Sequence, residues 1–136
     1  MDPKDRELLL KDLTGRLQYG VVCFAKWKEE APNGTSGYVD ELSTFLIDEF
    51  IAEETICELK PYLRPLSSMT AEEWEQYSEF ENAITDYDAD TRILAGTMVD
   101  WLNEKHFDYR GLIGKGLAIE VGPGKNPYLR TRVDEA

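Results

Sequence analysis

At residues 60–73 the chain reads Lys60-Pro61-Tyr62-Leu63-Arg64-Pro65-Leu66-Ser67-Ser68-Met69-Thr70-Ala71-Glu72-Glu73. The two prolines disfavour both a helix and a central strand over 60–66, because proline donates no backbone hydrogen bond. The end of the stretch has the pattern of a capping box, in which Thr70 and Glu73 bond each other's backbone at a helix start. We therefore predict an extended crossover over 60–66, followed by a helix over 71–84 with the inward residues Trp74, Tyr77, Phe80 and Ile84.

A second distinctive stretch is Asp100-Trp101-Leu102-Asn103 with His106-Phe107-Asp108-Tyr109-Arg110-Gly111-Leu112-Ile113. Apolar residues at helical spacing predict a helix over 92–105, and a final strand is expected over 117–121. Trp74 and Trp101 are predicted core aromatics, so replacing either by Ala should cost roughly 3–5 kcal/mol.

Together the two stretches resemble a family of small, uncharacterised proteins that are common in gut Bacteroidales genomes, often near phage-like or mobile elements. The similarity spans Lys60 to about Glu120 and is weaker over Leu8–Val22. The resemblance implies one small α+β domain. It implies no catalytic residue, cofactor or partner.

The N-terminal half opens with a helix signal, since Asp2 is a suitable N-cap and Pro3 suits the first helical position. We predict this helix over 3–14, with Gly15 as its C-cap. Apolar residues then alternate over 17–28, which predicts a strand.

Residues 38–59 are rich in β-branched and aromatic side chains. We predict two or three short strands here, with Asp48-Glu49 and Glu53-Glu54 as the turns between them. A helix over 40–52 is the alternative, because some apolar residues also fit helical spacing: Leu42, Phe45, Leu46 and Phe50.

The predicted fold class is α+β. It consists of a small, curved antiparallel sheet or partly open barrel, an N-terminal helix and two helices in the second half. Residues 1–124 are expected to form a single domain, and residues 125–136 a polar, flexible tail.

The charge of the chain is uneven. The formal net charge is −12, and residues 29–90 contain seventeen acidic residues against two basic ones. Such an acidic middle disfavours direct nucleic-acid binding, because phosphates would be repelled. It suits either a solvated face or a surface for a basic partner.

No segment has the length of apolar sequence that crosses a membrane, and the N-terminus does not read as a secretory signal. The two cysteines, Cys23 and Cys57, are expected to be reduced and buried, which predicts a cytoplasmic protein.

The motifs of common active sites are incomplete. Asp86-x-Asp88-x-Asp90 opens like a calcium loop, but Thr91 and Thr97 stand where Gly and Glu are needed. His106 is the sole imidazole, and we expect it to pack or cap at the end of the 92–105 helix. Neither Gly114-Lys115 nor Gly124-Lys125 has the phosphate-loop spacing. We therefore predict no catalytic, cofactor-binding or metal site.

Two groups of residues remain as candidates for an interaction or a local structural role. One is Asp108-Tyr109-Arg110, in which the arginine suits either an internal ion pair or a partner. The other is acidic and consists of Asp48, Glu49, Glu53 and Glu54.

The leading functional hypothesis is a non-enzymatic protein-binding or accessory module of a mobile element or prophage. Its protein partner is unidentified, and the aromatic content would also suit a homo-oligomer. The alternatives are an acidic inhibitor that mimics nucleic acid and a small enzyme of unknown class.

Overall fold

The computed structural model describes residues 1–85 and 91–128, with the side chains of 1–84 and 95–128. The elements are α1 (Pro3–Arg16), the 3₁₀ turn η1 (Leu17–Tyr19), β1 (Val22–Trp27), β2 (Gly37–Glu41), α2 (Thr44–Ala52), β3 (Ile56–Leu63), the 3₁₀ turn η2 (Leu66–Ser68), α3 (Ala71–Thr85), α4 (Thr91–Glu104) and β4 (Ile119–Glu120). The strands form a sheet in the order β2-β1-β3-β4. β1 pairs antiparallel with β2 and β3, whereas the short β4 pairs parallel with β3. The α+β prediction is confirmed, and the sheet is open rather than closed into a barrel.

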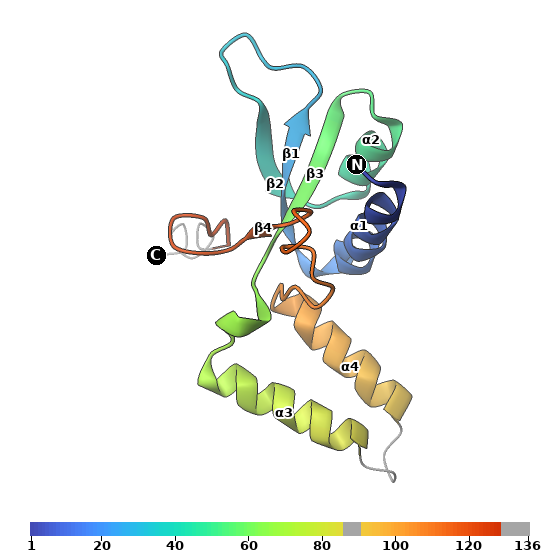
Figure 1. Cartoon of the computed structure of the whole chain (residues 1–136), viewed down its shortest axis with the longest axis vertical. Coiled ribbons are helices and arrows are strands. Elements are labelled where there is room, and N and C mark those ends of the chain that lie inside the picture. Colours follow the sequence, from blue (N-terminus) through green and yellow to red (C-terminus); the bar gives the residue numbers. More distant parts are fainter. Residues whose placement is uncertain (86–90, 129–136) are drawn as a thin grey trace.

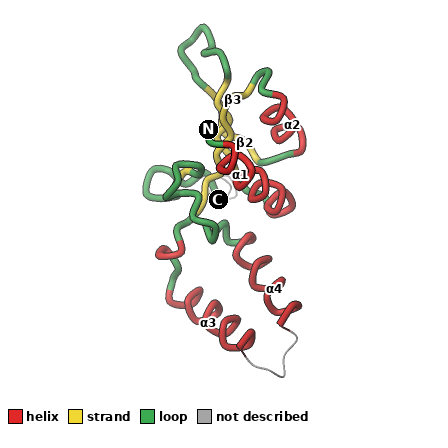
Figure 2. The backbone as a smooth tube through the Cα atoms, turned by 45° about the vertical axis from the view of Figure 1, so that its right-hand side comes forward, coloured by secondary structure: helices red, strands yellow, loops and turns green. Residues whose placement is uncertain are grey.

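The molecule has two parts that differ in how well they are packed. α1 and α2 cover one face of the sheet, and α3 and α4 form a hairpin that projects away from it (Figures 1 and 2). The main core lies between the sheet, α1, α2 and the loop after α4, and its buried residues are Leu9, Leu13, Val21, Cys23, Ala25, Leu42, Leu46, Ile47, Phe50, Ile56, Leu59, Leu63, Leu112, Leu117 and Ala118. Among the side chains that the structure describes, the second cluster has three buried residues, which are Met69, Leu102 and Phe107.

Helix α1 begins as predicted but ends later. The Asp2 carboxylate accepts a hydrogen bond from the Lys4 backbone N–H, and Pro3 is the first helical residue. The predicted C-cap at Gly15 is wrong, because the helix continues to Arg16. Arg16 is drawn into the helix by a buried ion pair with Asp12, one turn earlier.

The predicted strand over 17–28 is shorter in the structure. Residues 17–19 form η1, and Gly20 has a φ of 70°, so the strand begins only at Val22. Positive φ favours glycine because it has no Cβ to clash. The alternation is correct within the strand, where Cys23 and Ala25 are buried.

The preferred reading of residues 38–59 as several strands is wrong in its middle, where α2 spans Thr44–Ala52. The Ser43 hydroxyl accepts a hydrogen bond from the Leu46 backbone N–H and caps this helix. α2 buries Leu46, Ile47 and Phe50 against the sheet, so tertiary packing overrides the β propensity of these residues. Asp48 and Glu49 consequently lie within a helix rather than in a turn.

The predicted crossover over 60–66 is wrong at its start, because β3 continues through Pro61 to Leu63. The Val121 N–H bonds the Leu63 carbonyl, so odd-numbered β3 residues direct their backbone polar groups toward the β4 side. Pro61 faces this side before β4 pairing begins at Tyr62, and its nitrogen therefore needs no partner.

Tyr128 is inserted into the sheet between β1 and β3. Its hydroxyl accepts from the Val22 backbone N–H at 3.0 Å and donates to the Tyr62 carbonyl at 2.8 Å. Val22 and Tyr62 directly follow the last β1–β3 pair, Cys23 with Pro61, so the hydroxyl extends the ladder by bridging the next two backbone groups. Tyr128, in the first part of the predicted tail, therefore packs against the sheet, and residues 129–136 lie outside the described residues.

The second-half helices are confirmed. α3 spans Ala71–Thr85, and α4 spans Thr91–Glu104. The capping box is present, since the Glu73 carboxylate accepts from the Thr70 N–H at 2.9 Å and the Thr70 hydroxyl from the Glu73 N–H at 3.2 Å. The segment Asp86–Asp90, which resembles the start of a calcium loop, lies outside the described residues.

Candidate functional site

Arg64 holds both ends of the α3–α4 hairpin. Its guanidinium binds the two carboxylate oxygens of Glu73 at 2.7 and 2.9 Å, near the start of α3, and lies 4.3 Å from the ring centre of Phe107. Its backbone N–H donates to the His106 carbonyl, and its carbonyl accepts from the Asp108 N–H, just after α4. The Arg64 guanidinium holds the pKa of Glu73 below its usual value.

We call the base of the hairpin, where Arg64 contacts Glu73 and residues 106–108, the root of the hairpin. A buried cluster of charged side chains joins this root to α1. Asp12 and Arg16, both fully buried, pair at 2.8 Å, and Arg16 donates a second hydrogen bond to the Phe107 carbonyl at 2.7 Å. Arg110 reaches the other oxygen of Asp12 at 2.7 Å. The root of the hairpin is therefore fixed by charge-assisted hydrogen bonds, which are the stronger kind.

The three candidate residues Asp108, Tyr109 and Arg110 all lie at this root. The Asp108 carboxylate accepts from the Leu112 and Ile113 N–H groups, both at 2.9 Å. The Arg110 guanidinium lies 4.7 Å from the Tyr109 ring centre while it pairs with Asp12. Of the two roles considered for this arginine, the geometry shows the internal ion pair.

The acidic candidates lie elsewhere, on α2 and the turn after it. Glu53 pairs with Arg6 of α1 at 2.9 Å, and Glu49 accepts a hydrogen bond from the Thr55 hydroxyl. Asp48 and Glu54 are exposed. Figure 1 places α2 at the opposite end of the sheet from the hairpin, so the structure does not join these carboxylates to the Asp108 group.

His106 packs at the end of α4, as predicted, but not as a cation. It has a φ of 62° and stacks on Tyr128, with ring centres 4.0 Å apart. Burial, together with Arg16 and Arg64 nearby, lowers the pKa of His106 to about 4. The ring is therefore neutral at neutral pH.

The described residues contain neither an activated nucleophile nor a metal site. Cys23 is buried and burial raises the pKa of its thiol, whereas Cys57 is exposed, contrary to prediction, and neither is in a disulfide. Thiol chemistry needs the thiolate, so Cys23 is poorly suited to it. No group of three or more His, Cys, Asp or Glu residues within 1–85 and 91–128 is arranged to hold a metal ion.

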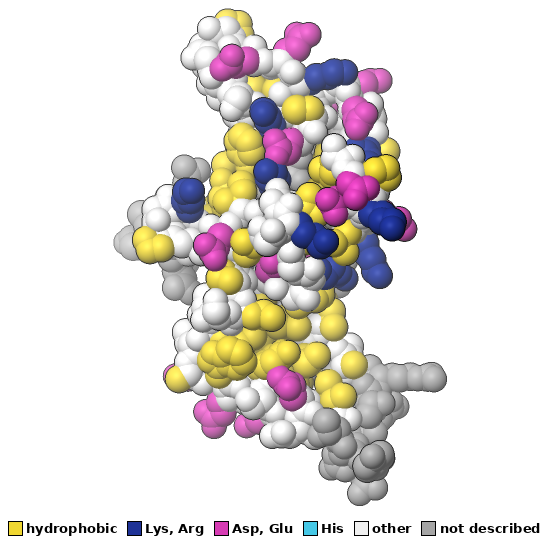
Figure 3. All heavy atoms as spheres, viewed as in Figure 1, with side chains coloured by type: hydrophobic (Ala, Val, Ile, Leu, Met, Phe, Trp, Pro, Cys, Tyr) yellow, Lys and Arg dark blue, Asp and Glu magenta, His cyan; other side chains and the backbone are white. Residues whose placement is uncertain are grey.

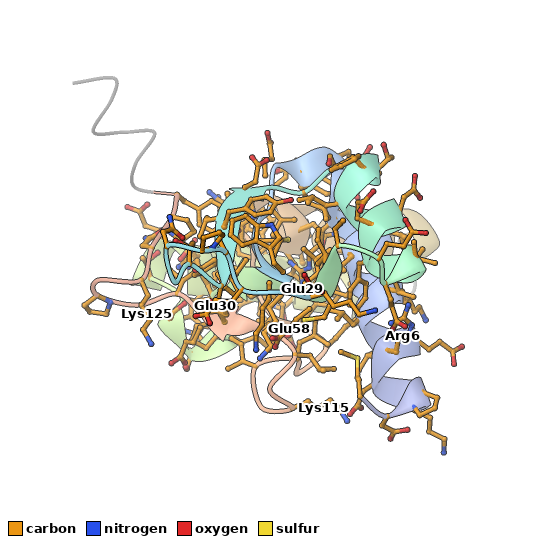
Figure 4. The ribbon with its side chains drawn as sticks, turned by 90° about the horizontal axis from the view of Figure 1, so that it is seen from above. Arg6, Glu29, Glu30, Glu58, Lys115 and Lys125 are labelled. Carbon is orange, nitrogen blue, oxygen red and sulfur yellow. The ribbon has the colours of Figure 1, made fainter. Side chains whose placement is uncertain are left out.

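The glycine–lysine pairs give no phosphate cradle either. Figure 4 shows Lys115 and Lys125 on two separate loops, each side chain directed outward. A phosphate site of the loop type requires backbone N–H groups and a lysine that converge on one point.

The α3–α4 hairpin leaves much of its apolar surface only partly buried. Along α3, residues 71–84 include no buried apolar side chain: Trp74 is 45% exposed, and Tyr77, Phe80 and Ile84 are only partly buried. The predicted inward position of Trp74 is therefore wrong. The main packing partner of α3 is α4, and Trp74 lies away from this contact and faces solvent.

A hollow lies between the two helices. It has a volume of about 230 Å³ and is lined by Gln76, Glu79 and Phe80 of α3 and by Trp101 of α4. The Trp101 indole N–H donates to the Gln76 side-chain oxygen at 3.2 Å, and its ring contacts Phe80 and Phe107. Figure 3 shows apolar side chains gathered over the hairpin, with acidic groups around them and lysines and arginines confined to the upper part of this view.

Sequence reasoning missed the charged residues of the root, which are Asp12, Arg16, Arg64 and Glu73. One signal was available for the first pair, because an acid and an arginine four residues apart share a helix face. The Arg64–Glu73 pair carried no such signal, since it depends on how β3 leads into α3.

Comparisons with protein-family models, with curated proteins and with solved structures gave no match. The resemblance to the Bacteroidales family therefore remains a hypothesis. Within the described part of the chain, no helix has both the length and the apolar character to cross a membrane.

Proposed function

We propose that the chain is a non-enzymatic protein-binding module whose α3–α4 hairpin docks a partner protein. The observation that carries the proposal is that α3, over residues 71–84, buries no apolar side chain of its own. Short helices are marginal in water and gain most of their stability in proteins by burying an apolar stripe. α3 retains such a stripe with much of it uncovered.

The composition of the exposed surface supports docking. Trp and Tyr are enriched at protein interfaces, where they supply large contact areas, and an exposed apolar patch rimmed by polar residues is typical of an interaction site. The hairpin presents Trp74, Tyr77, Phe80 and Trp101 in this setting. The root described above fixes the orientation of this surface relative to the sheet.

The family resemblance gives the proposal a setting, as an accessory protein of a mobile element or prophage in the cytoplasm. The acidic inhibitor remains a second candidate because residues 66–104 contain ten acidic residues and one basic residue. A mimic of nucleic acid requires carboxylates on a continuous face, however, and the exposed aromatic side chains interrupt the acidic surface of α3.

Photocrosslinking tests the proposal. Benzoylphenylalanine replaces Phe80 on the hairpin or, as the matched control, Phe45, which is 63% exposed on α2. In a lysate of the source organism we expect a defined crosslinked protein from position 80 and not from position 45. The crosslink should disappear when Trp101→Ser is added, because Trp101 lies beside position 80. A crosslink from both positions, or from neither, contradicts the proposal.

A further inference from the structure

The hairpin carries most of the net charge of the chain. Residues 66–104 have a formal net charge of −9, and the rest of the chain has −3. On α3 the exposed carboxylates Glu72, Glu75, Glu79 and Glu81 surround the aromatic residues. Of these, Glu79 lines the hollow itself.

The shape of the hollow suits one apolar anchor from a partner. Its volume of about 230 Å³ exceeds the roughly 150 Å³ that accommodates a benzene ring in an engineered protein cavity. Phe80 and Trp101 form apolar walls, and Glu79 and Gln76 form a polar edge. A leucine or phenylalanine side chain would fill it, with a cation beside it at Glu79.

The charge argues against a second copy of the chain as the occupant. Two hairpins placed face to face would bring one acidic rim against the other, and like charges across an interface oppose association. A partner that presents Lys or Arg around its apolar anchors meets the same surface with complementary charge. An amphipathic helix supplies both features at once, with apolar residues on one face and basic residues along its flanks.

From this arrangement we propose that the α3–α4 hairpin binds the apolar face of a basic amphipathic helix in a partner protein. The inference rests on the proposed docking function and adds the chemistry of the occupant. The apolar face lies on Phe80 and Trp101, which wall the hollow, and the flanking cations lie against Glu75 and Glu79.

A displayed peptide library tests the occupant directly. Each peptide has a fixed leucine stripe at helical spacing, and each remaining position is encoded as Lys or Glu with equal frequency. The library is selected on the whole chain and, separately, on Phe80→Ser, which removes one apolar wall of the hollow. We expect enrichment on the wild type, a loss of enrichment on Phe80→Ser, and an excess of Lys over Glu of roughly twofold to fivefold at flanking positions, as exposed ion pairs would give.

Charge variants provide the matched control. Glu75→Gln/Glu79→Gln removes two exposed carboxylates from the hairpin, and Glu7→Gln/Glu30→Gln removes two exposed carboxylates from the rest of the molecule. The Lys excess should fall on the first variant and persist on the second. Because all four substitutions lie at the surface, the comparison does not depend on a variant that unfolds.

The outcomes separate the two proposals. Peptides that need Phe80 but show no Lys excess would leave docking intact and overturn the basic-helix inference. Enrichment that is equal on the wild type and on Phe80→Ser would overturn both. A concentration-dependent dimer that Phe80→Ser abolishes, measured by sedimentation of the free protein, would also overturn the inference, because the occupant would be a second copy.

Discussion

At the scale of single residues, the buried charges of the hairpin root hold parts of the chain that are distant in sequence. Arg16 joins α1 to Phe107, and Arg110 joins the loop after α4 to the same aspartate that pairs with Arg16. These groups lie in a region with little water to screen them. Their removal should therefore have larger effects than the loss of ion pairs at the surface.

Arg16→Ala should lower the free energy of unfolding by about 3–5 kcal/mol, because it leaves Asp12 buried beside one remaining cation. Arg6→Ala removes the partly exposed pair with Glu53 and should cost about 1 kcal/mol or less. Urea denaturation of the two variants measures the difference. Equal losses would mean that the Asp12–Arg16 pair is as well solvated as the surface pair.

The stability of the protein should fall on acidification before the carboxylates titrate. The pKa of His106 drops from 6.5 to about 4 on folding, so the folded state binds fewer protons than the unfolded chain between these values. Stability therefore decreases as the pH is lowered through this window, by about 1–3 kcal/mol in total. The groups that face the ring are Arg16, Arg64 and Tyr128.

Thermal unfolding between pH 7 and pH 5, above the range in which most carboxyl groups titrate, measures this dependence, with His106→Asn as the comparison. Asn tolerates positive φ and does not titrate, so the variant should lose the slope between pH 7 and pH 5, whatever its stability at neutral pH. The assignment is simple because His106 is the only histidine of the chain. An unchanged slope in the variant would assign the titration to other groups.

At the scale of elements, the start of α3 depends on one carboxylate with two roles. Thr70→Ala removes only the cap hydroxyl and should cost about 1 kcal/mol. Glu73→Gln weakens both the return bond to Thr70 and the pairing with Arg64, and should cost more, about 2–3 kcal/mol. Chemical denaturation of both variants gives the order, and a larger loss for Thr70→Ala would contradict the bridging role of Glu73.

The two tryptophans of the hairpin should differ in their contributions to stability. Trp74→Ala should cost about 1 kcal/mol or less, because its side chain is 45% exposed. Trp101→Ala should cost about 2–4 kcal/mol, because the ring packs on Phe80 and Phe107. Differential scanning calorimetry measures both, and similar losses would show that Trp74 is covered in solution.

The elements that the sequence predicts well are those whose signals are local. The capping box at Thr70 and Glu73 and the N-cap at Asp2 depend on residues within one turn, and both helix starts are correct. Residues 44–52 are misread because their β-branched and aromatic side chains suit a strand, whereas Ser43 and contact with the sheet select a helix. Pro61 is misread because its effect depends on which neighbouring strand its nitrogen faces.

The sequence alone does not predict that the hairpin exposes apolar side chains, for a related reason. The apolar stripe of α3 has the spacing of a core helix, and the sequence does not show that this stripe is only partly covered. Exposure of Trp74 follows from the position of the whole hairpin, which is set by distant pairs such as Arg110 with Asp12.

At the scale of the whole molecule, the sheet half and the hairpin half should differ in local stability. β1 lies between two strands and carries residues of the main core, whereas α3 packs mainly against α4 and has no buried apolar side chain over residues 71–84. Amide hydrogen exchange should therefore be faster in α3 than in β1, as expected for regions with few buried contacts. Equal protection of the two elements would contradict the division into a well-packed and a poorly packed half.

The contact of the Tyr128 hydroxyl with Val22 and Tyr62 also bears on the order in which the sheet is completed during synthesis. The ribosome makes the chain from its N-terminus, and domains begin to fold as they emerge. β1 and β3 are complete by Leu63, yet the position between Val22 and Tyr62 is filled by a side chain that lies 106 residues after Val22. The nascent sheet therefore has an open polar gap at this position until residue 128 has been made.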